Sequence, residues 1–375
     1  MLIGVPKEIK SDEYRVGLTP ESVEKLTQSG HEVMIEQNAG LGIGKDNKAY
    51  EDAGAEIVQT REEIFQRAEM IVKVKEPQLD ECALLRSDQI LFTYLHLAPD
   101  PEQVKALLAS GCRAIAYESV KADDGSYPLL TPMSEVAGRM AVQAGATCLE
   151  KAKGGLGRLI GGVTNVDPAE VVVIGGGVVG YNSIEIAIGM QANVTVLDKS
   201  AERLDQLESI FGDKLNAVLA TDENNHECIK AADIVIGAVY IPGASAPKLI
   251  SRELVKSMKD GSVFVDVAID QGGCSETSKP TTHSEPTYVE EGVLHYCVAN
   301  MPGAVPMTST YALNNATISY VLSLANNGFN EALILDDGFC EGLNIHTGKV
   351  TIAAVAEEHG YEYHNPIDLI KGLSE

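Results

Sequence analysis

Short apolar runs alternate with amphipathic stretches along the N-terminal third of the chain. LIGV (2–5), MIVKVK (70–75) and QILFTYL (89–95) have the length and composition of strands. PESVEKLTQSG (20–30) and PEQVKALLASG (101–111) have helical periodicity, and each begins with proline and ends with glycine, as helices commonly do. This alternation predicts a parallel sheet covered by helices.

A second strand and helix series begins near residue 170, after the pattern breaks at KADDGSYPLLTPMS (121–134). VVVIGGGVVG (171–180), NVTVLD (193–198) and SVFVDVAI (262–269) are nearly all apolar and rich in β-branched residues. Parallel strands that are buried on both faces have this composition. The second series therefore predicts a second parallel sheet.

Two helices are predicted to connect these series. SEVAGRMAVQAGATCLEKA (134–152) is rich in Ala and Gly, which would let a neighbouring helix approach closely, and TSTYALNNATISYVLSLANN (308–327) would carry the chain back. A length of 375 residues suits two α/β domains better than one core. The sequence thus predicts an α/β fold in which one Rossmann-like domain (131–305) is inserted into a discontinuous one (1–130 and 306–375).

Charge narrows the possible partners. Lys and Arg number 29 against 54 Asp and Glu, a formal net charge of -25. Such a surface repels phosphate backbones and anionic lipids, which predicts no nucleic-acid or membrane partner. A carboxylate ligand would need a local cluster of cations.

Cysteine usage and the N-terminus bear on the compartment. The seven cysteines are scattered singly, and an odd count without a CxxC pair argues against a disulfide framework. The segment MLIGVPKEIK lacks an apolar signal core, and no window approaches 18 uninterrupted apolar residues. These features predict a cytoplasmic protein, and the histidines show no metal-ligand spacing, which predicts no metal.

A glycine motif gives the strongest chemical signal. Gly175-x-Gly177-x-x-Gly180 directly follows the apolar strand and directly precedes a helix predicted to begin near Val178. The first glycine makes the turn, the second lets a pyrophosphate approach the backbone, and the third allows close helix–strand packing. Asp198 ends the next strand, where an acid binds the adenosine ribose and repels a 2′-phosphate. The motif predicts NAD as cofactor; an ordinary glycine turn is the alternative, and Lys199 and Arg203 could weaken discrimination against NADP.

Four side chains are candidates for chemistry on a small substrate. Arg15 lies between the first strand and the first helix, and Lys75 ends an apolar run; both could bind a carboxylate, although most such residues are surface charges. His96 follows a strand, and histidine is the residue type whose ordinary pKa is nearest neutrality, which suits acid–base work, although a structural role is common. Asp270 ends a strand of the inserted domain, or else caps a turn before Gly272. The sequence therefore predicts an active-site cleft between a cofactor domain (131–305) and a substrate domain.

In its sequence motifs the chain resembles the alanine dehydrogenase family. This family is related to the NAD-binding subunit of the proton-translocating nicotinamide nucleotide transhydrogenase. The resemblance covers essentially the whole chain. Its most specific pieces are GVPKEIKSDEYRVGLTP, TYLHLA, VVVIGGGVVG, DVAIDQGG and, above all, VANMPGAVPMTSTYALNNAT.

The resemblance implies NAD-dependent, reversible oxidative deamination of L-alanine to pyruvate and ammonium by a homohexamer. Arg15 and Lys75 would hold the substrate carboxylate, His96 would act as acid and base, and Asp270 would assist beside the nicotinamide. The implied substrate-binding residues also include Tyr94, Met133 and Asn300. The implied cofactor-binding residues are Ser134, Gly175, Gly177, Val178, Val179, Gly180, Asp198, Val239, Ile269, Asp270 and Met301.

Two other functions stay open from the sequence. A transhydrogenase-type subunit would pass hydride to the NADP of a partner that includes a membrane domain. A catalytically silent protein would bind NAD without turnover. The segment NMPGAVPMTSTYAL, together with Arg15, Lys75 and His96, favours alanine dehydrogenase.

Overall fold

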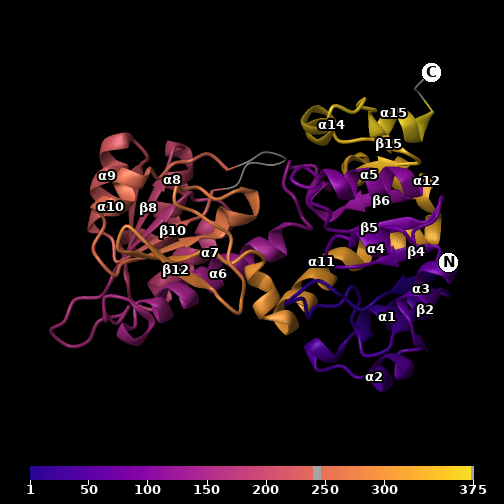
Figure 1. The fold of residues 1–375 in the computed structure, drawn as a ribbon, viewed down its shortest axis with the longest axis horizontal. Helices are drawn as coiled ribbons and strands as arrows, with labels where there is room; N and C mark the ends of the chain where they lie inside the picture. The colour runs from indigo at the N-terminus through magenta and orange to yellow at the C-terminus, as the bar shows by residue number, and fades with distance from the viewer. Residues whose placement is uncertain (240–245, 373–375) are drawn as a thin grey trace. The chain divides into compact units, whose positions relative to one another are not determined.

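The computed structural model describes residues 1–239 and 246–372, which form two compact units (Figure 1). Unit 1 comprises Met1–Met133 and Gly303–Glu375, and unit 2 comprises Ser134–Pro302. Each unit is built around one sheet. Among the described residues, no helix is both long and apolar enough to cross a membrane.

Unit 1 contains an eight-stranded sheet in the order β15-β14-β6-β5-β4-β1-β2-β3. The strands from β3 to β6 are parallel, in the order 3-2-1-4-5-6 that defines a Rossmann sheet. The parallel sheet predicted from the sequence is therefore confirmed, while the antiparallel edge of β14 and β15 was not predicted. The strands are β1 (Leu2–Val5), β2 (Glu32–Glu36), β3 (Glu56–Val58), β4 (Met70–Val72), β5 (Ile90–Thr93), β6 (Arg113–Ala116), β14 (Leu343–His346) and β15 (Lys349–Val350).

Helices of unit 1 begin directly after residues whose side chains cap the helix N-terminus. Thr19 accepts a hydrogen bond from Ser22 N and precedes Pro20, the first residue of α1, so the predicted start is confirmed. The helices are α1 (Pro20–Gln28), α2 (Asn47–Asp52), α3 (Arg61–Arg67), α4 (Leu79–Cys82), α5 (Pro101–Ser110), α11 (Pro306–Asn327), α12 (Phe329–Ile334), α13 (Asp337–Glu341), α14 (Ala353–His359) and α15 (Pro366–Lys371), with the short 3₁₀ helices η1 (Leu41–Ile43) and η2 (Tyr117–Ser119).

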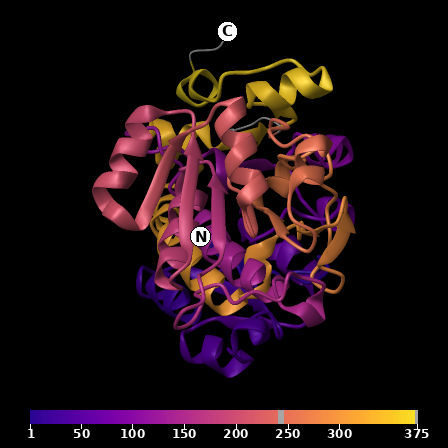
Figure 2. The same ribbon diagram turned by 90° about the vertical axis from the view of Figure 1, so that its left-hand side faces the viewer.

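Unit 2 contains a seven-stranded sheet in the order β12-β13-β11-β10-β7-β8-β9. Strands β7 to β11 and β13 are parallel, and β12 pairs antiparallel with β13 at one edge. Figure 2 shows strands of this sheet running side by side among helices. The strands are β7 (Glu170–Ile174), β8 (Asn193–Asp198), β9 (Leu215–Leu219), β10 (Ile234–Gly237), β11 (Val263–Asp266), β12 (Thr287–Glu290) and β13 (Val293–Tyr296). The helices are α7 (Val178–Gly189), α8 (Ala201–Phe211), α9 (Asp222–Ala231) and α10 (Arg252–Ser257), with η3 (Lys151–Lys153), η4 (Gly212–Lys214) and η5 (Val267–Gln271).

Helix α6 (Thr131–Cys148) packs closely on its neighbours, as its small residues predict. A Cβ atom on Gly138 would lie 2.3 Å from the carbonyl oxygen of Val179 in α7. The Ser183 hydroxyl donates a 2.9 Å hydrogen bond to the Gly138 carbonyl. Only a glycine allows the two helix backbones to come this close.

The 3₁₀ turn η6 (Met301–Ala304) follows β13 further along the chain.

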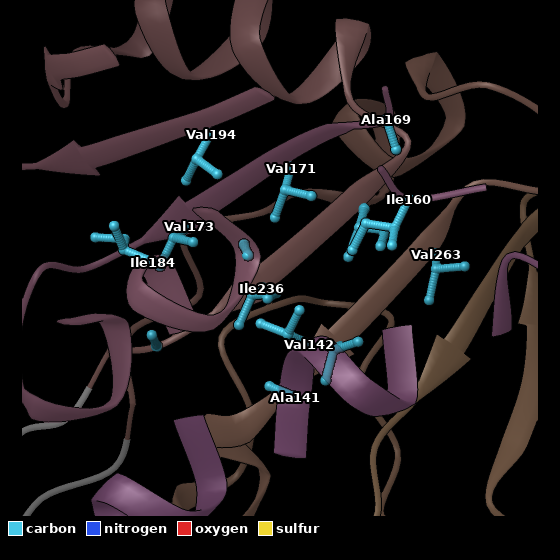
Figure 3. Packing of buried hydrophobic residues seen from close by; sticks show 14 of the residues in the cluster. Ala141, Val142, Ile160, Ala169, Val171, Val173, Ile184, Val194, Ile236 and Val263 are labelled. Atoms are coloured by element: carbon cyan, nitrogen blue, oxygen red, sulfur yellow. The ribbon is translucent and has the colours of Figure 1, made fainter. Parts of the chain in front are cut away.

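The core of unit 2 lies between its strands and α6 and α7. Figure 3 shows side chains of β7 (Val171 and Val173) and β10 (Ile236) in one cluster with Ile184 of α7 and Val142 of α6. These side chains are almost completely buried. Burial of this continuous apolar surface stabilises the strand ends that carry the site.

Candidate functional site

The candidate residues of unit 1 follow neighbouring strands. Arg15 follows β1, Lys75 follows β4 and His96 follows β5, and these strands lie next to one another in parallel. Their carboxyl ends therefore meet at one edge of the sheet, the carboxyl edge of unit 1. Between β1 and β4 the strand order reverses, which is where ligands bind in open α/β sheets.

Arg15 is 2% exposed, so the alternative that it is a surface charge is wrong. Its Nε and Nη2 atoms donate to the two Glu13 oxygens at 2.7 and 2.6 Å, and Nη1 lies 3.1 Å from Sδ of Met133. Burial lowers the pKa of Arg15, but its hydrogen bonds to Glu13 and the charge of Glu13 raise the pKa by more. The guanidinium is thus charged and fixed in orientation.

Lys75 is also buried, at 7% exposure, which excludes a surface role. Its Nζ lies 4.0 Å from Oε2 of Glu76. The Glu8 carboxylate accepts hydrogen bonds from the main-chain N–H groups of Val74 and Lys75, at 2.7 and 3.3 Å. Glu8 therefore holds the chain where Lys75 leaves the strand.

A fully buried ionic triad supports this position. The Lys73 ammonium lies 3.0 Å from Glu8 and 2.9 Å from Glu81. Burial lowers the pKa of Lys73, but the two carboxylates raise it by more, so Lys73 stays charged. Burial raises the pKa of Glu8 against the effect of Lys73. Sequence analysis missed this triad; the one signal was a lysine inside the apolar run MIVKVK.

His96 lies three residues after β5, in the left-handed region with a φ of 48°. Its imidazole stacks on the Tyr94 ring, with ring centres 5.8 Å apart and planes 2° apart. The Tyr94 hydroxyl donates to the Leu129 carbonyl at 2.6 Å. The His96 side chain is 40% exposed, so the ring is accessible to a ligand.

Helix α11 fixes the segment that follows Arg15. Asn314 accepts a 2.8 Å hydrogen bond from Thr19 N and donates a 3.1 Å bond to the Gly17 carbonyl. Thr310 accepts a 3.4 Å bond from Val16 N. Both side chains are buried, which explains why this mostly apolar helix carries them.

The glycine motif of unit 2 has the geometry that each glycine requires. Gly175 has a φ of 98°, and a Cβ there would lie 2.8 Å from the Ala238 carbonyl oxygen. A Cβ on Gly180 would lie 1.8 Å from the Gly175 carbonyl oxygen, whereas a Cβ on Gly177 would meet nothing within 4 Å. The first and third glycines are needed by the fold itself. A Cβ on the second would lie in open space before α7, at the helix N-terminus that a dinucleotide pyrophosphate approaches in this motif.

Asp198 ends β8 as predicted and faces the same turn. Its carboxylate accepts hydrogen bonds from Gly176 N at 2.6 Å and from Ser200 N at 2.8 Å. Arg203 donates from Nε to the Gly176 carbonyl at 2.7 Å. The acid is thus fixed beside the glycine turn, where a ribose would lie, and these residues fit a dinucleotide.

The expectation that Asp270 ends a strand is wrong. β11 ends at Asp266, and Asp270 lies in the 3₁₀ helix η5, exposed, with its carboxylate 3.3 Å from the N–H of Asn300. The cap of this turn is instead Asp266, which accepts from Ala268 N at 3.0 Å and Cys274 N at 2.9 Å. Burial raises the pKa of Asp266. Sequence analysis missed Asp266, although an acid inside VFVDVA was its signal.

The other predicted cofactor residues occupy varied surroundings in unit 2. Val178 is exposed in the first turn of α7, and Val179 packs partly on the core. Ile269 and Met301 are buried, and Met301 belongs to the core cluster. The remaining two, Ser134 in α6 and Val239 after β10, are partly buried.

Comparison with known proteins bears on both units. The N-terminal domain of the alanine dehydrogenase/PNT family matches residues 4–137, and the C-terminal domain matches residues 141–353. The chain belongs to the alanine dehydrogenase/PNT family. The resemblance that the sequence motifs indicated is therefore confirmed.

Relatives within the alanine dehydrogenase/PNT family match over nearly the full length. The chain is 55% identical to an alanine dehydrogenase of Halomonas elongata, over 99% of this chain and 100% of that protein. A solved L-alanine dehydrogenase structure has a TM-score of 0.92 and 49% identity, and the match covers 96% of this chain and 99% of that one. A transhydrogenase of Sinorhizobium meliloti has a TM-score of 0.81 at 25% identity, with 94% and 100% covered.

Proposed function

We propose that the chain catalyses the reversible, NAD-dependent oxidative deamination of L-alanine to pyruvate and ammonium. The observation that carries this proposal is the set of buried cations and one accessible histidine at the carboxyl edge of unit 1. This set occurs in a chain that shares about half of its residues with alanine dehydrogenases over their full length.

Arg15 and Lys75 would bind the substrate carboxylate. Both are buried, and Arg15 is oriented by Glu13. Cations that are fixed before the substrate arrives bind it with little loss of side-chain entropy. Met133 and Tyr94 lie beside these groups, since Met133 contacts Arg15 and Tyr94 stacks on His96. They would bound the space for the substrate methyl group.

His96 would take the proton of the substrate ammonium, because only a neutral amine can assist departure of the α-hydride. The same imidazole would exchange protons with the attacking water and the departing ammonia. Its exposure leaves the ring open to substrate. Asp270, with Asn300 beside it, would assist from unit 2.

The glycine turn, the N-terminus of α7 and Asp198 would hold the cofactor. Gly177 gives the pyrophosphate open space, and Asp198 would accept hydrogen bonds from the ribose hydroxyls. Ser134, Val178, Val179, Val239, Ile269, Asn300 and Met301 complete the proposed surroundings. When bound, NAD⁺ would supply the hydride acceptor.

The first experiment is an absorbance assay for NADH at alkaline pH, where the amine is neutral. Purified protein receives NAD with L-alanine, D-alanine, glycine or L-lactate, and the series is repeated with NADP. Strong reduction with L-alanine and NAD alone supports the proposal. Binding of NADH without turnover of any substrate favours a silent NAD-binding protein, and an obligate NADP-binding membrane partner favours a transhydrogenase-type subunit.

A substitution tests the proposed acid and base. His96→Ala should lower turnover at least about 100-fold, because the step loses its proton acceptor. The affinity for NADH, measured by calorimetry, should stay unchanged. Unaltered turnover would exclude His96 as the acid–base residue.

The proposed compartment and oligomeric state are those that the resemblance to the family implies. We propose a cytoplasmic homohexamer with small-molecule partners only. The seven cysteines are free thiols, which suits a reducing compartment. Light scattering of the purified protein measures the assembly, and a mass other than six chains would contradict the hexamer.

A further inference from the structure

Glu118, which follows β6 in η2, binds the main chain at His96. One carboxylate oxygen accepts a 2.7 Å hydrogen bond from His96 N, and the N–H of Leu95 lies 3.1 and 3.3 Å from the two oxygens. The imidazole Nδ1 is 3.8 Å from the nearer oxygen, which is too long for a hydrogen bond. The carboxylate therefore hydrogen-bonds to the backbone, whereas its contact with the ring is an ion pair only when the imidazole is protonated.

The backbone at His96 needs such a partner. A φ of 48° lies in the left-handed region, which a non-glycine residue occupies only where its surroundings hold it. Two successive N–H groups, those of Leu95 and His96, converge on one carboxylate. Because the backbone direction at His96 sets where its Cβ points, this anchor and the stacking on Tyr94 together set the position of the imidazole.

The same arrangement recurs at the other two candidate residues of unit 1. Glu13 accepts a 3.1 Å hydrogen bond from Arg15 N, and Glu8 accepts a 3.3 Å bond from Lys75 N. At this edge, a glutamate accepts the main-chain N–H of each candidate residue. Glu118 offers the clearest test, because its side chain is 14% exposed and lies outside the buried triad.

We propose that Glu118 is a positioning residue that fixes His96 in its left-handed backbone conformation and so aims the imidazole at the substrate. This inference rests on the proposed function of His96. It assigns the effect to hydrogen-bond acceptance by Glu118, which a glutamine retains, and not to its charge.

The test compares two variants. Glu118→Ala should lower kcat for L-alanine about 100-fold, since a misplacement of about 1 Å has an effect of this size. Glu118→Gln should stay within about tenfold of the wild type, because its amide oxygen accepts the same N–H groups. In the His96→Ala background, Glu118→Ala should have no further effect on turnover. Equal losses in Glu118→Ala and Glu118→Gln would overturn the proposal in favour of a charge effect on the ring.

Amide hydrogen exchange at residues 95 and 96 gives a readout that needs no activity. Exchange should be faster in Glu118→Ala than in the wild type and near normal in Glu118→Gln. Glu69→Ala is the matched control, because Glu69, just before β4, accepts a 2.7 Å hydrogen bond from the N–H of Leu2, the first residue of β1, at the amino ends of these strands. It should leave turnover and exchange at residue 96 unchanged.

The two readouts separate the two claims. If the wild type does not turn over L-alanine, the proposed function fails, and the exchange rates still decide whether Glu118 anchors His96. Unchanged exchange in Glu118→Ala overturns the anchor, whatever the activity. Unchanged kcat alongside faster exchange also overturns the proposal, because the anchor would then not serve the reaction.

Discussion

The two units share one strand order but use the space after their first strand differently. In unit 2, residues 175–177 turn directly from β7 into α7, and the backbone itself forms the binding surface. In unit 1, residues 6–19 separate β1 from α1 and carry Glu8, Glu13 and Arg15, all buried. The strand order determines where in each unit a site lies. The residues of the loop after the first strand determine which chemical groups the site contains.

Substitutions should therefore destabilise the two units for different reasons. Unit 1 depends on ion pairs that are complete only when every partner is present. Unit 2 depends on close backbone contacts that tolerate no added atoms.

Removing the central cation of unit 1 should have the largest effect. Lys73→Met leaves Glu8 and Glu81 buried without their shared partner, which should lower the free energy of unfolding by about 3–5 kcal/mol. Urea unfolding followed by circular dichroism measures this change. Lys48→Met is the control, because its pair with Asp52 is exposed and screened by solvent and should contribute little to stability. Equal effects in both variants would contradict the importance of the triad.

Two glycine substitutions separate folding from binding in unit 2. Gly180→Ala places a methyl group 1.8 Å from the Gly175 carbonyl and should lower the stability of unit 2 by about 3 kcal/mol. Gly177→Ala meets nothing within 4 Å and should leave the melting temperature unchanged. It should still weaken NADH binding about tenfold, because the methyl group occupies the space for the pyrophosphate. Full NADH affinity in Gly177→Ala would place the cofactor elsewhere.

Asp198 should determine the choice between NAD and NADP. Asp198→Gly removes the carboxylate that would repel a 2′-phosphate, and the preference for NAD over NADP should fall about tenfold. Relative kcat/KM values with the two cofactors measure it. Asp198→Asn is the companion variant, since it removes the charge but keeps an oxygen acceptor for one of the amides. An unaltered preference in both variants would show that the adenosine side is recognised by other residues.

The smallest expected effect is the pH dependence conferred by Glu76. Burial raises the pKa of Glu76, but Lys75 and Lys10 lower it by more, so the net pKa lies below its ordinary value of 4.5. A lowered pKa means that the charged form stabilises the fold above about pH 4.5 and that this stabilisation disappears as the pH falls further. Glu76→Gln should therefore lower stability at pH 7, and by progressively less as the pH falls below about 4.5. Parallel melting curves check this, and a difference that grows in acid would contradict it.

Local patterns in the sequence predicted the two parallel sheets and the glycine turn of the candidate site. The glycine turn, the N-terminus of α7 and Asp198 lie within one strand–helix–strand unit, so their spacing alone placed them. Glu8 and Asn314 could not be predicted, because each contacts residues far away along the chain. Glu118 lies only 22 residues from His96, but no sequence motif relates the two positions. The short antiparallel strands at both sheet edges were also missed, since strands of two to four residues carry little periodicity.

The clamp of Asn314 on Gly17 and Thr19 has a consequence for synthesis. A ribosome releases residues 134–302, all of unit 2, before it releases the α11 residues that complete the Arg15 loop. Unit 2 can fold while it is being made, whereas the loop that carries Arg15 gains its Asn314 partner only when α11 has emerged, its backbone groups bonding to water until then. The Arg15 loop is therefore completed after unit 2 has been made, although it precedes unit 2 in the sequence.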